Sequence, residues 1–437
     1  MISTRLSDVY QQTTQINAGY LVLFGIIFSL IGSFYPQAIV VSAVLYWLAS
    51  CKQRLSISPR NARQSLVLVG IGLLLTGVAF VNDSSLPVAE LLQGNVFIVS
   101  MLAGVSFLTV VSKPSIDKHE SLPRGKRTIL STYAGVHLFG AVINISSLFI
   151  HADRMTANRS LSRAQVMVLT RGFSAAAFWS PFFAAMAVAL SYAPQANLMV
   201  LMLAGGVLAI VSMLITFYDV NKTLTESIFY GYPLRLSSLW LPTLLTVLVF
   251  VIHHLFPKLS ILFIITLCSP LICLLLVTRK ERCRAIVADH IETKLANMQN
   301  EIVLFLSAGV FAFGLKMVLV NQDFIPMFEQ FNALTASACF VLIVLLSMLG
   351  FHMLIGVSIV APLVLPLNPD PSLLAVVILA SWALGSAVGP LSGMNISIQA
   401  SYGIDSKKIL AWNFRYVCLM ALLVMLVIST LDQWVLI

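Results

Sequence analysis

Most of this chain consists of apolar runs about as long as a lipid bilayer is thick, and this feature excludes nearly every soluble fold. Of the 437 residues, 59% are hydrophobic and only 10% are charged, whereas soluble domains carry roughly 25% charged residues. So little charge could not cover a water-facing surface of this size. Because lipid offers no hydrogen-bond partner to the backbone, a spanning segment must be helical and needs ~20 apolar residues. The sequence therefore predicts an all-α polytopic membrane protein.

Eleven of the apolar runs are predicted to span the bilayer. They are Ala18–Ser33, Pro36–Ser50, Ser65–Val81, Pro87–Val111, Gln165–Tyr192, Ala196–Tyr218, Leu236–Phe256, Leu259–Thr278, Ile302–Val320, Pro371–Tyr402 and Ala411–Leu436. The polar segment Met1–Gln15 precedes the first run, and no signal-peptide cleavage pattern follows that run. We therefore expect the first run to remain as a membrane helix.

Lysine and arginine residues predict which connectors are cytoplasmic, because cytoplasmic loops are enriched in both. Three connectors are basic, namely 52–63, 113–127 and 279–294. Segments 82–86 and 321–332 contain acidic residues but no Lys or Arg, so they are predicted to be external. This arrangement predicts a multi-pass protein of the bacterial inner membrane with a cytoplasmic N-terminus and an external C-terminus.

Two further apolar stretches, Leu130–His151 and Leu334–Pro366, do not fit single spans. The first has basic segments at both ends, and the second has external-looking segments on both sides. A single span would place its two ends on opposite faces of the membrane. We therefore predict two re-entrant hairpins, one from each face, which is typical of inverted-repeat transporters. Such backbone is tolerated at membrane depth only inside protein or beside a watery cavity.

An internal repeat supports this topology. The segment 135–140 (Gly-Val-His-Leu-Phe-Gly) resembles 350–356 (Gly-Phe-His-Met-Leu-Ile-Gly), and each is followed by a span with an interrupted centre. The interruptions lie at 174–181 and 385–395 and contain Ser, Gly, Pro and Asn. Paired apolar segments with Gly or Pro interruptions are the best sequence indicator of a transporter's binding site.

The interruptions would bring backbone polar groups into the membrane. Pro181 and Pro390 each remove one helical hydrogen bond, and Gly389 and Gly393 allow the helix to unwind. Freed carbonyls can bind a cation, and freed helix N-termini can bind an anion. The alternative is a kinked helix whose freed groups are satisfied by neighbouring side chains.

We predict that the substrate-binding residues meet in one cavity near the bilayer midplane. The candidates are Asn144, Ser146, Ser147, Arg171, Ser174, Ser180, Pro181, His352, Pro390, Ser392, Gly393 and Asn395.

The ionisable residues of the predicted spans each have two interpretations. Arg171 could clamp an anion or extend to the membrane interface, and the same two interpretations apply to Lys316. His137 and His352 could carry protons or serve as packing residues. We expect sodium or a proton as coupling ion, with backbone near Asn144 and Gly389 as a possible sodium site, and no other cofactor.

These features resemble the ion transporter superfamily, whose best-described members are the divalent anion:sodium symporters. The resemblance is one of plan, from about Pro87 onward: eleven spans, two opposed hairpins and a broken helix after each. The family's Ser-Asn-Thr hairpin tip has a partial counterpart in 144–147 (Asn-Ile-Ser-Ser) and none in the second hairpin. The resemblance implies an elevator-type carrier, a mobile domain sliding against a scaffold, and a homodimer.

On this plan the chain divides into four parts. Residues 1–86 form N-terminal scaffold helices, 87–235 the first repeat, 236–300 further scaffold helices with an amphipathic cytoplasmic linker, and 301–437 the second repeat. The linker prediction depends on an apolar stripe and charges on the opposite face of the segment 279–300.

The leading hypothesis is a secondary active transporter of a small anion, of the organic-acid class. Candidate cations, opened helix ends and the lack of a carboxylate at any span centre favour an anion. Alternatives are an exporter of a toxic or amphipathic compound, a membrane protein handling a lipid-linked substrate, and a non-transporting scaffold. The net charge of +9 lies in connectors, so nucleic acid is not an expected partner. The chain has no P-loop, HExxH or nucleophile elbow, so we do not expect an enzyme.

Overall fold

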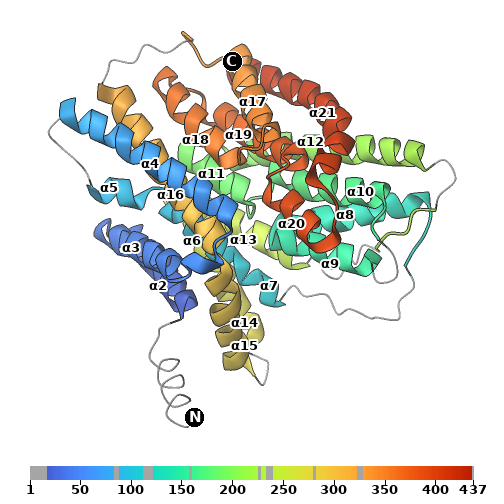
Figure 1. The fold of residues 1–437 in the computed structure, drawn as a ribbon, viewed down its shortest axis with the longest axis horizontal. Helices are drawn as coiled ribbons and strands as arrows, with labels where there is room; N and C mark the ends of the chain where they lie inside the picture. Colours follow the sequence, from blue (N-terminus) through green and yellow to red (C-terminus); the bar gives the residue numbers. More distant parts are fainter. Residues whose placement is uncertain are drawn as a thin grey trace.

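The computed structural model describes residues 17–82, 88–111, 122–156, 160–224, 228–232, 240–278, 282–321 and 328–435. Within these ranges the chain is helical, apart from connecting turns and an isolated bridge between Arg124 and Tyr230 (Figure 1). The segment predicted to be a cytoplasmic N-terminus and parts of the predicted basic and external connectors lie outside the described residues.

One group of helices comes from the N-terminal third and the middle of the chain. It contains α2 (Ala18–Gly32), α3 (Gln37–Lys52), α4 (Pro59–Asn82), α5 (Val88–Gln93), α6 (Val96–Ser106), α7 (Leu108–Val111), α13 (Trp240–Leu255), α14 (Ile261–Val277) and α16 (Gln299–Asn321). Helices α4 and α16 cross in close contact, because Gly72 faces Gly314 and a Cβ atom on Gly314 would lie 2.3 Å from the Gly72 carbonyl oxygen. Small residues at such crossings are typical of membrane helix packing.

The second group contains the repeat elements. It comprises α8 (Lys126–Ile143), α9 (Ile145–Thr156), α10 (Arg163–Ala175), α11 (Ala184–Tyr192), α12 (Leu198–Thr223), α17 (Ala333–Met348), α18 (Met353–Val364), α19 (Pro371–Val388), α20 (Gly393–Tyr402) and α21 (Ser406–Val435). Both predicted hairpins are present as the helix pairs α8–α9 and α17–α18. Both predicted interruptions are present as the breaks between α10 and α11 and between α19 and α20.

The sequence explains where these elements turn and stop. Asn144 adopts φ 52° between α8 and α9, and Gly350 adopts φ 100° between α17 and α18. These are positive-φ conformations, which Gly adopts at least cost because it has no Cβ atom. Helix α19 begins with Asp370 as N-cap and Pro at its first position, and the Gly-Pro pair at 389–390 ends it.

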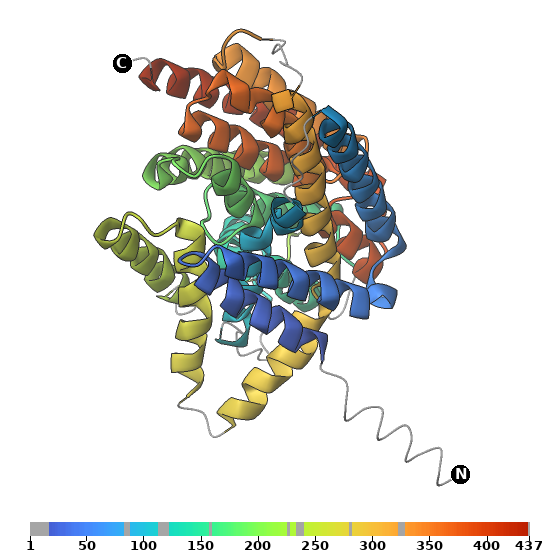
Figure 2. The same ribbon diagram turned by 90° about the vertical axis from the view of Figure 1, so that its left-hand side faces the viewer.

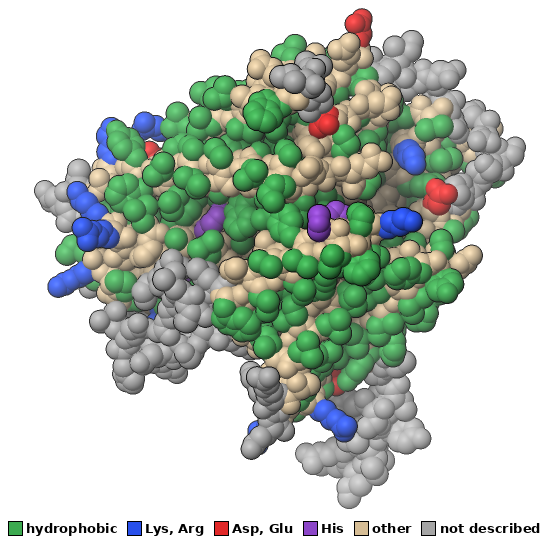
Figure 3. Space-filling view, turned by 180° about the vertical axis from the view of Figure 1, so that it is seen from behind, with side chains coloured by type: hydrophobic (Ala, Val, Ile, Leu, Met, Phe, Trp, Pro, Cys, Tyr) green, Lys and Arg blue, Asp and Glu red, His purple; other side chains and the backbone are tan. Residues whose placement is uncertain are grey.

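The surface chemistry of the long helices requires lipid. Six described helical segments are long and apolar enough to cross a membrane: Pro59–Val81, Val88–Val111, Leu198–Thr223, Gln299–Val320, Pro371–Tyr402 and Ser406–Trp434. Leu66, Leu203 and Leu422 on three of them are 63–73% exposed, and hydrophobic side chains dominate the face in Figure 3. By contrast α19 is almost wholly buried at the centre of the molecule. The chain is an all-α polytopic membrane protein.

The predicted linker helix is present as α15 (Cys283–Asp289), followed by a π-helical turn, His290–Lys294, and a 3₁₀ turn, Leu295–Asn297. The π turn packs against the start of α2, where a Cβ atom on Gly19 would lie 1.8 Å from the Ile291 carbonyl oxygen. Tyr20 also donates a hydrogen bond to Glu292. The linker is thus fixed to the first group of helices rather than lying free (Figure 2).

Hydrogen bonds join the connector ends in two sets. Those at the linker end include Asn300 with Ser58, and Tyr402 with Asp153. Those at the other end include Ser372 with the Asn197 N–H, and Asp432 with the Ala333 N–H. Segments predicted to share a membrane face therefore contact one another, while the assignment of the linker end to the cytoplasm stays a prediction.

Candidate functional site

A cavity of about 220 Å³ lies where both hairpin turns and both helix breaks meet, and we call it the central cavity. Its polar and glycine lining comes from Asn144, Ser146, Ser106, Thr109, His352, Ser386, Ser392 and Gly393, and its two charged residues are Lys294 and Glu301. Its aromatic lining is Phe173, Phe183, Phe305 and Trp382. The cavity thus joins elements that are more than 200 positions apart in sequence.

Four helices begin at the central cavity. Ser146 lies in the first turn of α9, Ala184 is the first residue of α11, Met353 the first of α18 and Gly393 the first of α20. All four residues line the cavity. The first turn of a helix has N–H groups without intrahelical partners and a partial positive charge. Four such ends at one cavity make its electrostatic character favourable to an anion.

The start of α20 is built by two side chains. The Ser392 hydroxyl accepts a hydrogen bond from the Asn395 N–H at 3.2 Å and donates to the Ser386 carbonyl at 3.0 Å. In the described part of the chain, no atom lies within 4 Å of the position that a Cβ on Gly393 would take. The backbone of Gly393 is therefore open to a ligand.

His352 and His137, which occupy matching repeat positions, have different environments. His352 caps α18, and its Nδ1 accepts a hydrogen bond from the Leu354 N–H at 3.2 Å, so Nε2 carries the proton in the neutral ring. Its ring stands edge-on to Trp382 at 5.7 Å. His137 instead uses both nitrogens, on the Gly172 carbonyl and the Trp179 indole N–H. His352 lines the cavity and His137 does not.

Asn395 lies behind the cavity rather than in its lining. It is fully buried, and its Nδ2 donates to the carbonyls of Gly389 at 3.0 Å and Ser386 at 3.3 Å. Asn413 on α21 donates to the Ala387 carbonyl at 3.0 Å. Side chains therefore satisfy the carbonyls that the second break frees, as the alternative interpretation proposed. The Asn395 Oδ1 is a buried acceptor without a hydrogen-bond partner among the described residues.

The candidates of the first break also lie behind the cavity. Ser180 donates to the Ala141 carbonyl, and Ser147 donates to the Val136 carbonyl at 3.1 Å, so both hold the first hairpin in place. Ser174 is buried and reaches the carbonyl of its own helix one turn back. Pro181 and Pro390 shape the two breaks without lining the cavity.

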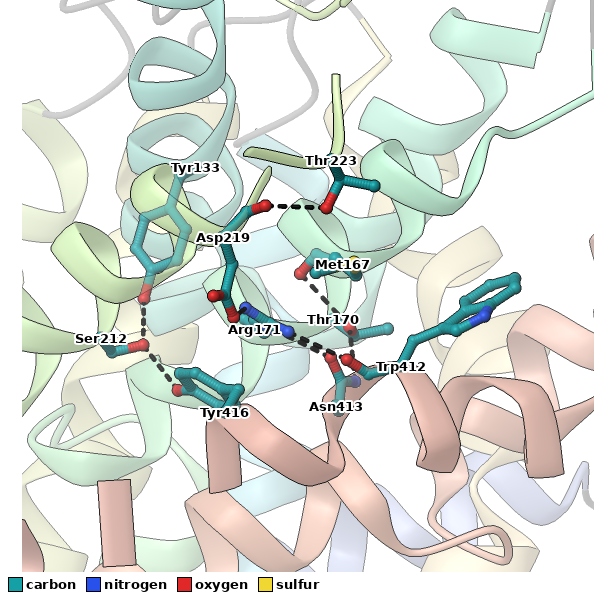
Figure 4. Close-up of polar contacts among 10 residues, drawn as sticks. All are labelled: Tyr133, Met167, Thr170, Arg171, Ser212, Asp219, Thr223, Trp412, Asn413 and Tyr416. Atoms are coloured by element: carbon teal, nitrogen blue, oxygen red, sulfur yellow. Dashed lines mark hydrogen bonds and ion pairs between the residues drawn. The ribbon is translucent and has the colours of Figure 1, made fainter. Parts of the chain in front are cut away.

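Arg171 occupies neither of its two predicted positions. It is fully buried, and its guanidinium donates to the Asp219 carboxylate (3.0 Å), Asn413 Oδ1 (2.9 Å) and the Trp412 carbonyl (3.0 Å) (Figure 4). It also lies 4.5 Å from the ring centre of Tyr416. Because each of its three nitrogens donates to protein and the side chain is buried outside the cavity lining, Arg171 neither clamps a ligand in the central cavity nor extends to the interface.

Sequence reasoning missed the two charged residues of the cavity, Lys294 and Glu301. Both belong to the region around the linker, and Glu301 directly precedes a predicted span. Glu301 gives the cavity a carboxylate, although it stands at the edge of a predicted span rather than at its centre. Lys294 also lines a larger adjoining cavity of about 830 Å³, the inner vestibule, with Asp153 and Asp289. Ser146 lines both cavities, so the two adjoin each other.

Comparisons with known proteins give likeness to solved structures alone. No protein-family model matches the chain, and no curated protein matches it. The chain is similar to the crystal structure of the Alcanivorax borkumensis YdaH transporter, with 14% identity over 86% of this chain and 84% of that one. The TM-score is 0.41, and a likeness of this size carries no conclusion about function.

Proposed function

We propose that this protein is a secondary active transporter of a small anion, of the organic-acid class. The observation that supports this most is the meeting of four helix N-termini at the central cavity, because together they favour a negative charge there. Broken helices whose ends meet at one site are the usual binding architecture of such transporters.

The size and lining of the cavity favour a small acid. Its 220 Å³ is below the range of about 300–1,000 Å³ that is typical of sites for drug-sized ligands. Lys294 adds a cation, and the hydroxyl of Ser146 can donate to a carboxylate. Glu301 would exclude an acid whose second carboxylate approached it.

Two groups are candidates for coupling. Glu301 lines the cavity, and its carboxylate could take up and release a proton where the substrate binds. The unpartnered Asn395 Oδ1, beside the carbonyls of the second break, suits sodium, a cation that prefers neutral oxygen ligands. We propose coupling to one of these two ions, by an elevator-type movement of the second helix group, in a homodimer of the bacterial inner membrane.

A second candidate function is export of an amphipathic compound. The four aromatic rings of the central cavity favour it, because they give the cavity an apolar lining beside the helix ends. Such a compound would place its acidic group at the helix N-termini and its apolar body against Phe305 and Trp382.

Flux measurements in proteoliposomes test this proposal. A panel of labelled small organic acids is offered under sodium, proton and no gradient, with protein-free vesicles as control. We expect at least one acid to accumulate under a sodium or proton gradient and Gly393→Trp to abolish that accumulation, since its ring would fill the cavity. Accumulation of an amphipathic dye alone would favour the exporter, and no flux of any acid would contradict the proposal.

A further inference from the structure

A third cavity, of about 550 Å³, lies at the other end of the same helices, and we call it the outer cavity. Its polar lining is Gln93, Asn95, Ser191, Tyr192 and Lys316. Lys316 is its single charged residue among those described. Neither the cavity nor its lysine has a role in the proposed binding site.

The central and outer cavities share four walls. Helices α6, α11, α16 and α18 line both, and Figure 1 shows these helices next to one another. On α18, for example, Met353 at the N-terminus lines the central cavity and Pro362 near the C-terminus lines the outer one. On α16, Phe305 and Gly309 line the central and outer cavities, about 6 Å apart along the axis. The two cavities are thus stacked along one helix bundle.

A buried layer separates the two cavities, and it is apolar apart from Ser100, Ser307 and Ser358. The stretches of the four helices between them contain Val99, Met101, Met186, Leu306, Val357 and Ala361, each at most 1% exposed. The layer belongs on one side to α6 and α16 of the first helix group and on the other to α11 and α18 of the second. A relative movement of the two groups would therefore rearrange the layer and both cavities together.

Each end of this stack carries one lysine. Lys294 stands beside the central cavity and inner vestibule, and Lys316 stands at the outer cavity, about 22 Å along α16 from Glu301. Within the described residues Lys316 has an exposed side chain and no ion pair. Ionisable residues inside a membrane helix are costly and mark ligand paths when they face a polar cavity.

We propose that the outer cavity is a second, weaker anion site on the substrate's route, with Lys316 as its cationic ligand for a carboxylate. This proposal rests on the proposed transport function and adds a selective entrance on the side opposite Lys294. The basic connectors near the linker predict that the outer cavity faces the exterior. The competing interpretation is that Lys316 reaches lipid headgroups and does not contact substrate.

Transport measured separately from each side tests the outer site. Protein is reconstituted in a known orientation, and the apparent KM for a transported acid is determined with substrate on one side and then on the other. We expect Lys316→Gln to raise the KM at least threefold only from the outer-cavity side. Lys294→Gln is the matched control and should raise it only from the vestibule side.

Restoring the charge separates a binding role from a structural one. Lys316→Cys, with exposed Cys51 and Cys418 changed to Ser, should regain a low KM after modification by an aminoethyl thiosulfonate and not after modification by a sulfonatoethyl one. If the wild-type protein transports the acid but Lys316→Gln leaves the KM unchanged, or shifts it equally from both sides, the outer site is wrong and the proposed function still stands. No wild-type flux of any acid would overturn the proposed function with it.

Discussion

At the residue scale, Arg171 connects the two repeats at a distance from the cavity. It belongs to α10 of the first repeat and binds Asn413 Oδ1, while the amide of Asn413 holds the Ala387 carbonyl at the second break. Two further hydrogen bonds, Tyr416 to Ser212 and Ser212 to Tyr133, continue the buried network. Arg171 therefore positions the break that forms the start of α20.

Removing the Arg171 guanidinium should destabilise the protein strongly. Arg171→Gln would leave the Asp219 carboxylate, whose side chain is 11% exposed, without its partner, and such a loss costs up to about 3–5 kcal/mol. The double variant with Asp219→Asn should recover part of that loss, since it carries no unpaired charge. Thermal unfolding in detergent measures both, and Arg163→Gln, at the exposed start of α10, is the control expected within about 0.5 kcal/mol of wild type. Equal unfolding of the single and double variants would contradict the ion-pair explanation.

The sequence could predict the candidates at the turns and breaks but not which of them face a ligand. Asn144, Ser392 and Gly393 line the cavity because they stand at the first residues after a turn or break. Ser180 and Asn395 stand at similar places and point to backbone carbonyls instead. No local sequence pattern distinguishes a residue that lines the cavity from one that binds a backbone carbonyl, since the partner carbonyls belong to the other arm of a turn or to another helix. The same is true of Arg171, whose partners lie 48 and 242 positions away.

At the element scale, the long apolar runs predicted the spanning helices within a few residues of their ends. The hairpins and breaks were predicted because charge parity and the Gly and Pro positions indicated them. The π-helical turn of the linker and the division of one span into α5, α6 and α7 could not be predicted. The π turn packs so closely on Gly19 that tertiary contact, rather than local propensity, explains its geometry.

The turn of the first hairpin gives a prediction about one element. Asn144 has φ 52° and lines the central cavity, so we expect it to serve both the turn and the ligand. Asn144→Gly keeps the positive-φ turn at little cost, whereas Asn144→Val should lose about 1–2 kcal/mol of stability. Both lack the amide, so both should lower transport of the acid several-fold. Unfolding and flux measured on the two variants separate the roles; normal transport by Asn144→Gly would remove Asn144 from the site.

At the scale of the whole molecule, two helix groups of different character meet at the three cavities. The first group holds the linker and α16, and with them Lys294, Glu301 and Lys316. The second group supplies Asn144, His352 and Ser392, which are uncharged or titratable. If the second group moves relative to the first and carries the substrate, the substrate moves away from one lysine and toward the other. The fixed charges would then select anions at the two entrances rather than at the moving binding site.

Both hairpins are predicted to enter the bilayer and return to the same face. Helices α9 and α18 have 12 residues each, about 18 Å of helix, and the hydrocarbon core is about 30 Å thick. Neither can cross alone, so we expect each hairpin to return to the face from which it entered. We expect Arg127→Cys and Ser160→Cys, which flank the first hairpin, to react with an impermeant maleimide from the cytoplasmic face. Glu329→Cys and Asn368→Cys, which flank the second, should react from the opposite face. All four positions are exposed, and labelling of Arg127→Cys and Ser160→Cys from opposite faces would show that the first hairpin spans the membrane.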